Sequence, residues 1–519
     1  MASIGATNPA LAILSLISQT ITYARRVAFK IQMYNHAKGH YQDDLELHDI
    51  QAGQLVICLE FVRDVTPSFT NDLNDLLYKT LSRLTRSLEN ALATLERGTD
   101  KEGSIQWLWH TTLGRYALKR DLYEVEKDQV LFQRAVQLAT LFGGPGVTSH
   151  LTKDRLNGNI ALARVQRLRE AIQYRLRNDV NAPKMLLDKQ DIPAGKRRRL
   201  PYSDVQLVVS EISESPVALV EYRSQDTSDT RKIRDIALVL GGTDASMAMI
   251  RCHGFVPIPE TDRYELLFPL PQNPVKARTL RELLLSPDNN AGVRFSLNSR
   301  IKLAQRLATA ILFIHTAKLV HKNIRPENIV ILETDANIST SGGSECSQEI
   351  GDSFLMGFDF ARKEDQDSTR VGDDEWYRNI YRHPQRQGVH PEVDFNMLHD
   401  IYSLGVVLLE IALWRSFVLI EKDPYDAPKY VGNREACRFF DRKSGQLKDS
   451  YEIWKLFIRR AEAAVAPALG NKYRDTVLMC LRCLDGGFGD PSELVDQDGV
   501  LVGLVYIERV LTILDEITV

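Results

Sequence analysis

Residues 321–330 constrain the fold more than any other stretch of this chain. They read His-Lys-Asn-Ile-Arg-Pro-Glu-Asn-Ile-Val and follow an amphipathic helical pattern over residues 303–314. A short apolar run, residues 329–332, comes directly after the polar turn. A helix that leads through a proline-containing polar turn into a buried strand predicts a mixed helix-and-sheet domain around this segment.

The length of the chain requires more than this one domain. At about 100–200 residues per domain, 519 residues predict two to four domains. The formal net charge of −3 provides no overall attraction to nucleic acid or to a membrane, so we expect no nucleic-acid partner. Six scattered cysteines with one C-x-x-C pair, Cys480 and Cys483, form neither a disulfide framework nor a zinc site, and indicate reduced thiols in a cytoplasmic protein.

Residues 1–180 carry helical patterns and almost no strand signal. The clearest pattern spans residues 68–97, where leucines recur at three- and four-residue steps on one stripe. Pro67 suits the first turn of this helix and Gly98 the position just after it. Similar patterns cover residues 8–33, 41–64 and 104–141, with Ser104 as a candidate cap, and a glycine-rich turn at 143–146 precedes a helix that Thr148 or Ser149 opens. We therefore expect an all-α bundle.

The ends of this helical region carry two further signals. Residues 10–17 are apolar but lack a preceding positive charge, and they are too few to span a bilayer, so we expect neither a signal peptide nor a membrane anchor. Prolines, a glycine and the basic block Lys-Arg-Arg-Arg over 196–199 mark residues 181–203 as a basic linker. The block is either solvated charge, a nuclear-import signal or a patch for anionic lipid.

Residues 204–519 alternate strand and helix patterns. Strands are expected over 205–212, 217–223, 249–256 and 264–268, with one helix over 230–240 and a hinge at 269–271. This order predicts a small lobe over 204–272 and a mainly helical large lobe over 273–519. A Ser/Gly/Asp-rich insertion over 334–352 is expected to be a surface loop.

Three motifs in this half resemble those of protein kinases. Residues 321–330 resemble the catalytic loop H-R-D-L-x-P-E-N, and residues 354–362 resemble the segment around D-F-G. Residues 399–410 resemble the pattern D-x-[WY]-S-L-G-x-x-L-x-E, in which Asp400 holds the catalytic-loop backbone. The resemblance implies a bilobal protein-kinase-like fold after the helical bundle, so that the chain combines an all-α domain with an α+β domain.

The same motifs depart from the family where catalysis takes place. His321 is retained, but Asn323 replaces the catalytic aspartate, and an amide cannot act as a base at neutral pH. The order Gly357-Phe358-Asp359 replaces D-F-G, so the metal-binding aspartate is a glycine. Asn328 matches the asparagine that holds the second magnesium, and Arg325 stands where many kinases carry a lysine.

The nucleotide-holding parts of the small lobe also depart. Residues 201–217 contain no glycine, although kinases cover ATP with a glycine-rich loop. The lysine position holds Glu221 or Arg223, depending on register, and Asp235 is the only acid over 230–240. The resemblance therefore implies a pseudokinase that requires no cofactor, with weak or absent ATP and Mg²⁺ binding. Any such binding would use Arg223, Asn328 and Asp359 for the cofactor, and Asn328 and Asp359 for the metal.

The helical half resembles the HeLo and HeLo-like domains of fungal cell-death proteins through its apolar first helix and the amphipathic helices after it. The combined plan resembles the mixed-lineage kinase domain-like family. It implies a regulatory latch on a membrane-permeabilising cell-death or immune effector, with an upstream signalling protein or kinase, a homo-oligomer, and recruitment from the cytoplasm to anionic plasma membrane. Ser368, Thr369 and Tyr377 are the candidate phosphorylation sites.

Two alternative functions remain open from the sequence. One is an atypical but active Ser/Thr kinase that binds ATP and Mg²⁺ through Asn328 and Asp359. The other is a non-enzymatic scaffold whose helical bundle binds proteins rather than lipid.

Overall fold

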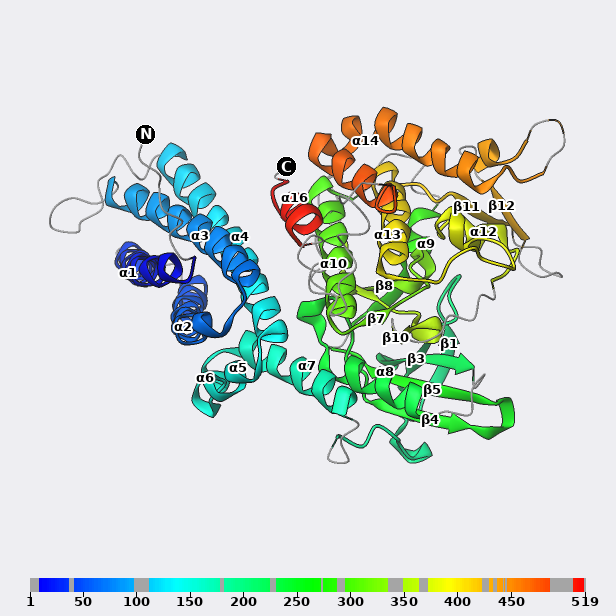
Figure 1. Cartoon of the computed structure of the whole chain (residues 1–519), viewed down its shortest axis with the longest axis horizontal. Helices are drawn as coiled ribbons and strands as arrows, with labels where there is room; N and C mark the ends of the chain where they lie inside the picture. The colour runs from blue at the N-terminus through cyan, green and yellow to red at the C-terminus, as the bar shows by residue number, and fades with distance from the viewer. Residues whose placement is uncertain are drawn as a thin grey trace. The chain divides into compact units, whose positions relative to one another are not determined.

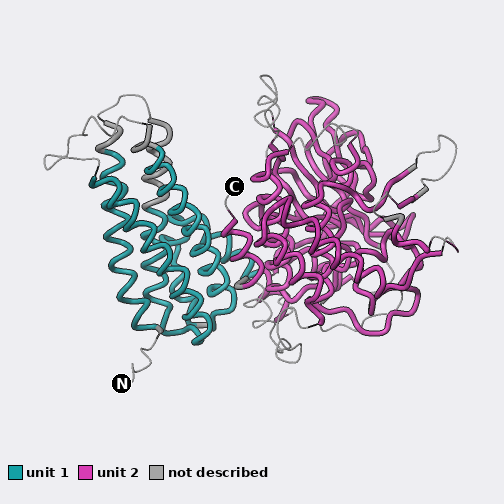
Figure 2. Tube along the Cα trace, turned by 90° about the horizontal axis from the view of Figure 1, so that it is seen from above, with its two compact units in different colours: residues 1–170 teal, residues 171–519 magenta. Residues whose placement is uncertain are grey.

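The computed structural model separates the chain into two compact units, residues 1–170 and residues 171–519 (Figure 2). The boundary lies within a helix, between Glu170 and Ala171, and each unit is described by itself. The structure describes residues 9–36, 42–97, 112–177, 182–224, 230–271, 274–286, 295–334, 349–363, 372–421, 429–432, 436–441, 443, 446–485 and 507–517.

The first unit is helical throughout its described residues, as the sequence predicts. Helix α3 packs against both α1 and α4 (Figure 1). None of the described helices is both long and apolar enough to cross a membrane. The helices are α1 (Pro9–His36), α2 (Gln42–Val65), α3 (Asn71–Arg97), α4 (Thr112–Phe142), α5 (Pro145–His150), α6 (Lys153–Gly158) and α7 (Ile160–Arg177), which continues past the boundary after Glu170.

The leucine stripe of α3 forms the centre of this bundle. Leu77, Leu81 and Leu84 are fully buried, and Pro67 lies in a short 3₁₀ turn that leads into the helix. The buried face of α1 is apolar except for Thr20, whose hydroxyl lies 2.6 Å from that of Thr85 on α3. This face consists of Ile13, Ile17, Thr20, Ala24, Val27 and Ile31.

The end of the bundle differs from the sequence prediction. Thr148 and Ser149 do not open the last long helix, because they lie inside the short helix α5, which starts at Pro145 after the N-cap Gly144. Helix α7 starts at Ile160 instead, where the side chain of Asn159 accepts a hydrogen bond from the backbone N–H of Leu162 at 3.0 Å. Ser104 and Gly98 lie outside the described residues.

The second unit contains a five-stranded antiparallel sheet with the strand order β1-β2-β3-β5-β4. Helix α8 (Thr230–Gly242) connects β3 to β4. The predicted strand over 249–256 is wrong at its start, because residues 249–253 follow a 3₁₀ turn and the strand begins only at Gly254. The strands are β1 (Lys196–Arg199), β2 (Gln206–Val209), β3 (Pro216–Ser224), β4 (Gly254–Ile258) and β5 (Arg263–Pro269).

Strand β1 lies inside the segment that the sequence predicts to be a basic linker. Its four residues pair with β2, from Lys196 opposite Val209 to Arg199 opposite Gln206. All four side chains are exposed, so the block has the polarity of a linker although its backbone is part of the sheet. Hydrophobic patterning cannot detect such a strand, because neither of its faces is apolar.

The remainder of the second unit surrounds two long buried helices, α10 (Leu297–Thr316) and α13 (Met397–Leu413). A three-stranded sheet with the order β6-β8-β9 and a two-stranded pair, β7 and β10, lie next to residues 321–328. The chain is thus a mixed helix-and-sheet protein with a helical N-terminal region. The remaining elements are β6 (Lys276–Thr279), α9 (Leu280–Leu284), β7 (Leu319–Val320), β8 (Ile329–Glu333), β9 (Asp352–Leu355), β10 (Arg362–Lys363), α12 (Trp376–Asn379), β11 (Val418–Glu421), β12 (Lys429–Gly432), α14 (Ser450–Leu481) and α16 (Thr512–Asp515).

Candidate functional site

The turn over residues 321–328 lies between strands β7 and β8 and is held from α13 by Asp400. One carboxylate oxygen of Asp400 accepts the backbone N–H of His321 at 2.7 Å, and the other accepts that of Lys322 at 2.9 Å. The Nε2 atom of His315 lies 3.2 Å from the same carboxylate. Burial alone would raise the pKa of Asp400. The hydrogen bond and the charge of His315, together with the electrostatic effect and backbone N–H of His321, lower this pKa below its usual range. Asp400 is therefore an ionised anchor for this turn.

His321 joins the turn to residues 356–358. Its Nε2 atom lies 3.1 Å from the carbonyl oxygen of Met356, and its ring meets that of Phe358 edge-on, with centroids 4.9 Å apart. Burial lowers the pKa of His321 to about 4, so the imidazole is neutral near pH 7. The backbone N–H of Met356 also donates to the carbonyl of Asn328 at 2.8 Å.

Asn323 uses both ends of its side-chain amide inside the protein. Its Nδ2 donates to Asp359 at 2.9 Å, and its Oδ1 accepts from Nε of Arg325 at 2.8 Å. Arg325 also forms an ion pair with Glu327 at 2.8 Å. The amide thus bridges a carboxylate and a guanidinium, an arrangement that needs one donor and one acceptor and that an aspartate could not reproduce.

Glu221 and Arg223, the two alternatives for the lysine position, lie on strand β3 and reach the same backbone turn. The carboxylate of Glu221 accepts the backbone N–H groups of Gly357 and of Phe358, the latter at 2.9 Å. Arg223 donates to the carbonyl of Phe358 at 2.8 Å. Burial raises the pKa of Glu221 to about 7, although the two N–H groups act in the opposite direction. Burial lowers the pKa of Arg223 to about 10.

Gly357 occupies the position where the resemblance expects a metal-binding aspartate. Its φ angle of 87° lies in the left-handed region that favours glycine. A Cβ atom there would lie 2.5 Å from Cγ of Asn328 and 2.6 Å from its Nδ2. Both the backbone conformation and the space therefore disfavour any side chain at residue 357.

The two expected metal ligands are engaged in different hydrogen bonds. Asn328 donates through Nδ2 to the carbonyl of Asn323 at 2.8 Å, whereas Asp359 accepts from the side chain of Asn323. Burial raises the pKa of Asp359 to about 6, against the lowering effects of Asn323 and Arg325. The described residues contain no group of three or more His, Cys, Asp or Glu side chains placed to hold a metal ion. We call the hydrogen-bonded set of Glu221, Asn323, Arg325, Gly357, Phe358 and Asp359 the turn network.

A buried ionic cluster, which the sequence did not predict, is joined to the turn network through Glu327 and Arg325. Arg281 of α9 contacts Glu327 at 2.9 Å, the hydroxyl of Tyr381 at 2.8 Å and Glu410 of α13 at 3.4 Å, and its side chain is 2% exposed. Glu327 links the cluster to Arg325. The only sequence signal for it is a set of charged residues at positions that otherwise read as core.

Tyr377 is the one candidate phosphorylation site within the described part of the chain; Ser368 and Thr369 lie outside it. Tyr377 is half-buried on α12 and stacks face to face on Tyr430 of β12, with ring centroids 3.7 Å apart. The guanidinium of Arg378 lies 5.7 Å from the Tyr377 ring centroid. The ring is therefore part of a packed aromatic surface.

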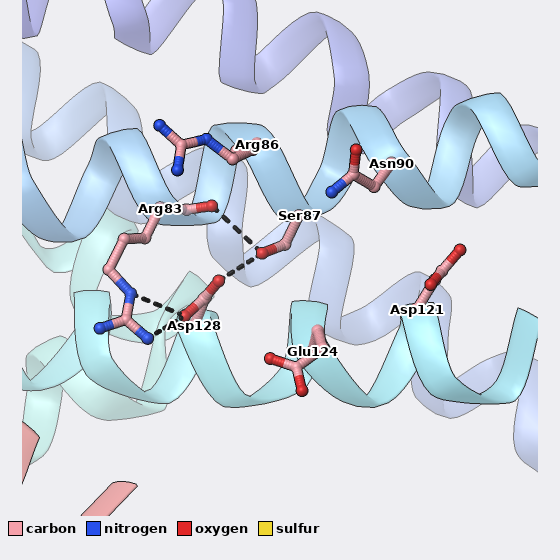
Figure 3. Close-up of a pocket in the computed structure, with 7 residues that line it drawn as sticks. All are labelled: Arg83, Arg86, Ser87, Asn90, Asp121, Glu124 and Asp128. Carbon is pink, nitrogen blue, oxygen red and sulfur yellow. Dashed lines mark hydrogen bonds and ion pairs between the residues drawn. The ribbon is translucent and has the colours of Figure 1, made fainter. Parts of the chain in front are cut away.

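The first unit contains a pocket of about 190 Å³ between α3 and α4, lined by polar side chains (Figure 3). Asp128 of α4 is buried and accepts from the hydroxyl of Ser87 and from Nε of Arg83, the latter at 3.2 Å. Seven residues after Ser87 on α3, and seven residues before Asp128 on α4, Thr94 donates to Asp121 at 2.7 Å. We call Arg83, Ser87, Thr94, Asp121 and Asp128 the polar seam. Sequence reasoning missed it because the leucine stripe dominates the pattern of α3.

Comparisons with known proteins assign no family to this chain. No model of a known protein family matches it, and no curated protein matches it significantly.

Proposed function

We propose that the second unit is a bilobal protein-kinase-like domain without catalytic activity, a pseudokinase, that acts as a regulatory latch on the helical first unit. The proposal draws on the antiparallel sheet with one helix between β3 and β4. It also draws on Asp400, whose bonds to the backbone of His321 and Lys322 match the role that the resemblance implies. On this proposal the small lobe begins at β1 rather than at residue 204.

The single observation that carries the proposal is the carboxylate of Glu221. It stands at one of the two alternatives for the ATP-binding lysine, and it holds the backbone N–H groups of Gly357 and Phe358. A carboxyl group there offers phosphate no positive charge, whereas a lysine attracts it. The turn network thus uses, for internal hydrogen bonds, the groups that a kinase would direct at nucleotide and metal.

The absence of a catalytic base at residue 323 also supports a domain without kinase activity. Asn323 cannot accept a proton from a substrate hydroxyl, and its side chain already bridges Asp359 and Arg325. Restoring aspartate at residue 323 would remove the donor to Asp359 and place two carboxylates in contact, which raises the pKa of one of them. Asn323→Asp alone is therefore expected to create no kinase.

The catalytic part of the proposal is tested with radiolabelled ATP, generic protein substrates, and Mg²⁺ or Mn²⁺. We expect no turnover from the full chain or from Asn323→Asp. Robust turnover that disappears in Asp359→Ala would overturn the proposal in favour of an atypical kinase that uses Asn328 and Asp359.

The effector part rests on the chemistry of α1. Its buried face is apolar, and Arg25 and Arg26 are exposed on the outside of the helix. If α1 left the bundle, it would present an amphipathic helix with basic residues, which is the type that binds anionic lipid surfaces. We propose that the first unit permeabilises membranes when the latch releases it.

Dye release from vesicles tests the effector part. Residues 1–180 and the full chain are added separately to phosphatidylserine vesicles and to phosphatidylcholine vesicles. We expect leakage from the anionic vesicles with the shorter chain and none with the full chain. Absence of both leakage and membrane partition, together with self-association or recruitment of proteins, would instead support a scaffold.

A further inference from the structure

The two edges of the five-stranded sheet differ. At the β4 edge, the backbone N–H of Leu187 donates to Phe255 at 2.9 Å, and that of Phe255 donates to Met185 at 2.8 Å, so residues 185–187 cover this edge. At the other edge, β1 pairs only with β2, and no strand of the described residues covers its outer side. An uncovered edge presents unpaired backbone N–H and C=O groups to another chain.

Alternate side chains of β1 have different roles. Arg197 forms a two-pronged ion pair with the buried Glu265 of β5, at 2.7 and 2.9 Å, and also donates to the hydroxyl of Tyr222. Arg199 donates to the carbonyl of Ser203 at 2.6 Å and pairs with Asp204. These two residues fasten the strand to its own sheet.

Lys196 and Arg198 alternate with Arg197 and Arg199 along β1. Because successive side chains of a strand point to opposite faces, Lys196 and Arg198 point to the other face of the sheet. Both are exposed, and neither has a side-chain partner among the described residues. Their positive charge disfavours pairing of the edge with neutral or basic strands, including a second copy of β1. An acidic strand is the one kind of chain that this edge attracts.

The backbone around β1 fixes the position of the edge. A Cβ atom at Gly195 would lie 2.3 Å from the carbonyl oxygen of Val209, so this glycine permits the close approach with which β1 begins. After the strand, the backbone N–H of Leu200 donates to Val205 at 2.9 Å and closes the turn into β2. The edge is therefore short and held in place before any partner arrives.

We propose that β1 binds an acidic peptide segment in extended conformation, which adds to the sheet edge as a sixth strand. Backbone hydrogen bonds provide the binding energy, as in other cases of strand addition. Carboxylates at alternate positions of the peptide pair with Lys196 and Arg198 and set its register. This inference is independent of the pseudokinase and effector proposals, because it uses only the sheet edge.

Fluorescence anisotropy of a labelled ten-residue peptide of alternating valine and glutamate, added to the full chain, tests the inference. We expect saturable binding that the double charge reversal Lys196→Glu with Arg198→Glu weakens at least about tenfold, since two attractions become repulsions. The matched control reverses Lys455 and Arg459, two exposed residues of α14, by the same total charge, and it should bind the peptide normally. Circular dichroism verifies that both variants are folded.

A second probe separates strand addition from simple charge attraction. The same peptide with methyl groups on all its backbone amides keeps its carboxylates but cannot donate backbone hydrogen bonds to the edge, so it should not bind. Equal binding of the methylated peptide, equal loss in both double variants, or no binding of the parent peptide would each overturn the inference. Sedimentation with phosphatidylserine vesicles that depends on Lys196 and Arg198, without peptide binding, would assign the strand to lipid instead.

Discussion

The polar seam of the first unit and the turn network of the second both bury carboxylates, but the carboxylates have different partners. Asp128 in the seam is held by side chains, Ser87 and Arg83, that reach across from a neighbouring helix. Glu221 in the turn network is held by backbone N–H groups of Gly357 and Phe358. Side-chain partners fix how two finished helices lie against each other, whereas backbone partners fix the conformation of the chain itself. The two networks should therefore respond differently to substitution.

The largest effect is expected where the turn network meets the core. Arg281→Met leaves Tyr381 and Glu410 buried without their cation, and it leaves Glu327 with Arg325 alone. Removing one partner of a buried ionic cluster costs about 3–5 kcal/mol. Urea denaturation should show this loss in the transition of the second unit only. The control Arg482→Met, which breaks a half-exposed pair with Glu462, should cost less than about 1 kcal/mol.

A smaller loss is expected in the polar seam. Asp128→Ala leaves the hydroxyl of Ser87 without its acceptor on α4 and removes the ion pair with Arg83. The expected cost is about 1–3 kcal/mol, in the transition of the first unit. Asp128→Asn keeps an acceptor for Ser87 and should cost less. If Asp128→Ala shifted the second unit as much as the first, the two networks would not be separate.

The pH dependence of stability tests the turn network at Glu221. Burial raises the pKa of Glu221 from 4.5 to about 7, so the folded state holds this proton more tightly than the unfolded state. The free energy of unfolding should therefore fall between about pH 4.5 and pH 7, relative to Glu221→Gln, which does not titrate. Urea denaturation of both proteins at pH 5 and pH 8 gives this difference. A difference that grows with pH would mean that Glu221 is ionised and stabilised by its N–H partners.

The smallest effect is expected at an ion pair on the surface of the first unit. Arg26 of α1 and Glu96 of α3 are 2.5 Å apart, with side chains 54% and 43% exposed. Arg26→Ala should change the free energy of unfolding by about 0.2–1 kcal/mol, because water screens the pair. A loss as large as that expected for Asp128→Ala would show that burial does not set the strength of the ion pairs in this bundle.

The sequence predicted the helices of the first unit well because their pattern is local. Leucine spacing alone locates α3, and the mixed sheet and helix pattern after residue 204 was also correct. It did not predict β1, whose four exposed basic residues carry no hydrophobic period. Thr148 and Ser149 were wrong as starts of the last long helix, because they lie inside the short helix α5 and α7 begins only at Ile160.

The candidate site was predictable in its residues but not in its contacts. The motif around residues 321–330 identified Asn323 and Asn328, and the motif over 399–410 identified Asp400. No pattern showed that Asn323 would bridge Asp359 and Arg325. Glu221 and Arg223 remained alternatives because register alone could not choose between them. The structure uses both, since residues two apart on a strand point to the same face. The contacts of Glu221 and Arg223 join segments more than one hundred residues apart, which spacing along the chain cannot predict.

The conformation of Gly357 has a consequence for the evolution of this chain. The side chain of an aspartate at residue 357 would clash with Asn328, and its backbone would have an unfavourable φ angle. Aspartate is therefore tolerated there only if the turn moves. The turn can move only when Glu221 no longer holds it, and lysine at residue 221 would leave two buried amides without an acceptor. Each substitution is thus harmful unless the other has already occurred. Single substitutions at residues 221 and 357 are therefore each disfavoured by the residue that now stands at the other position.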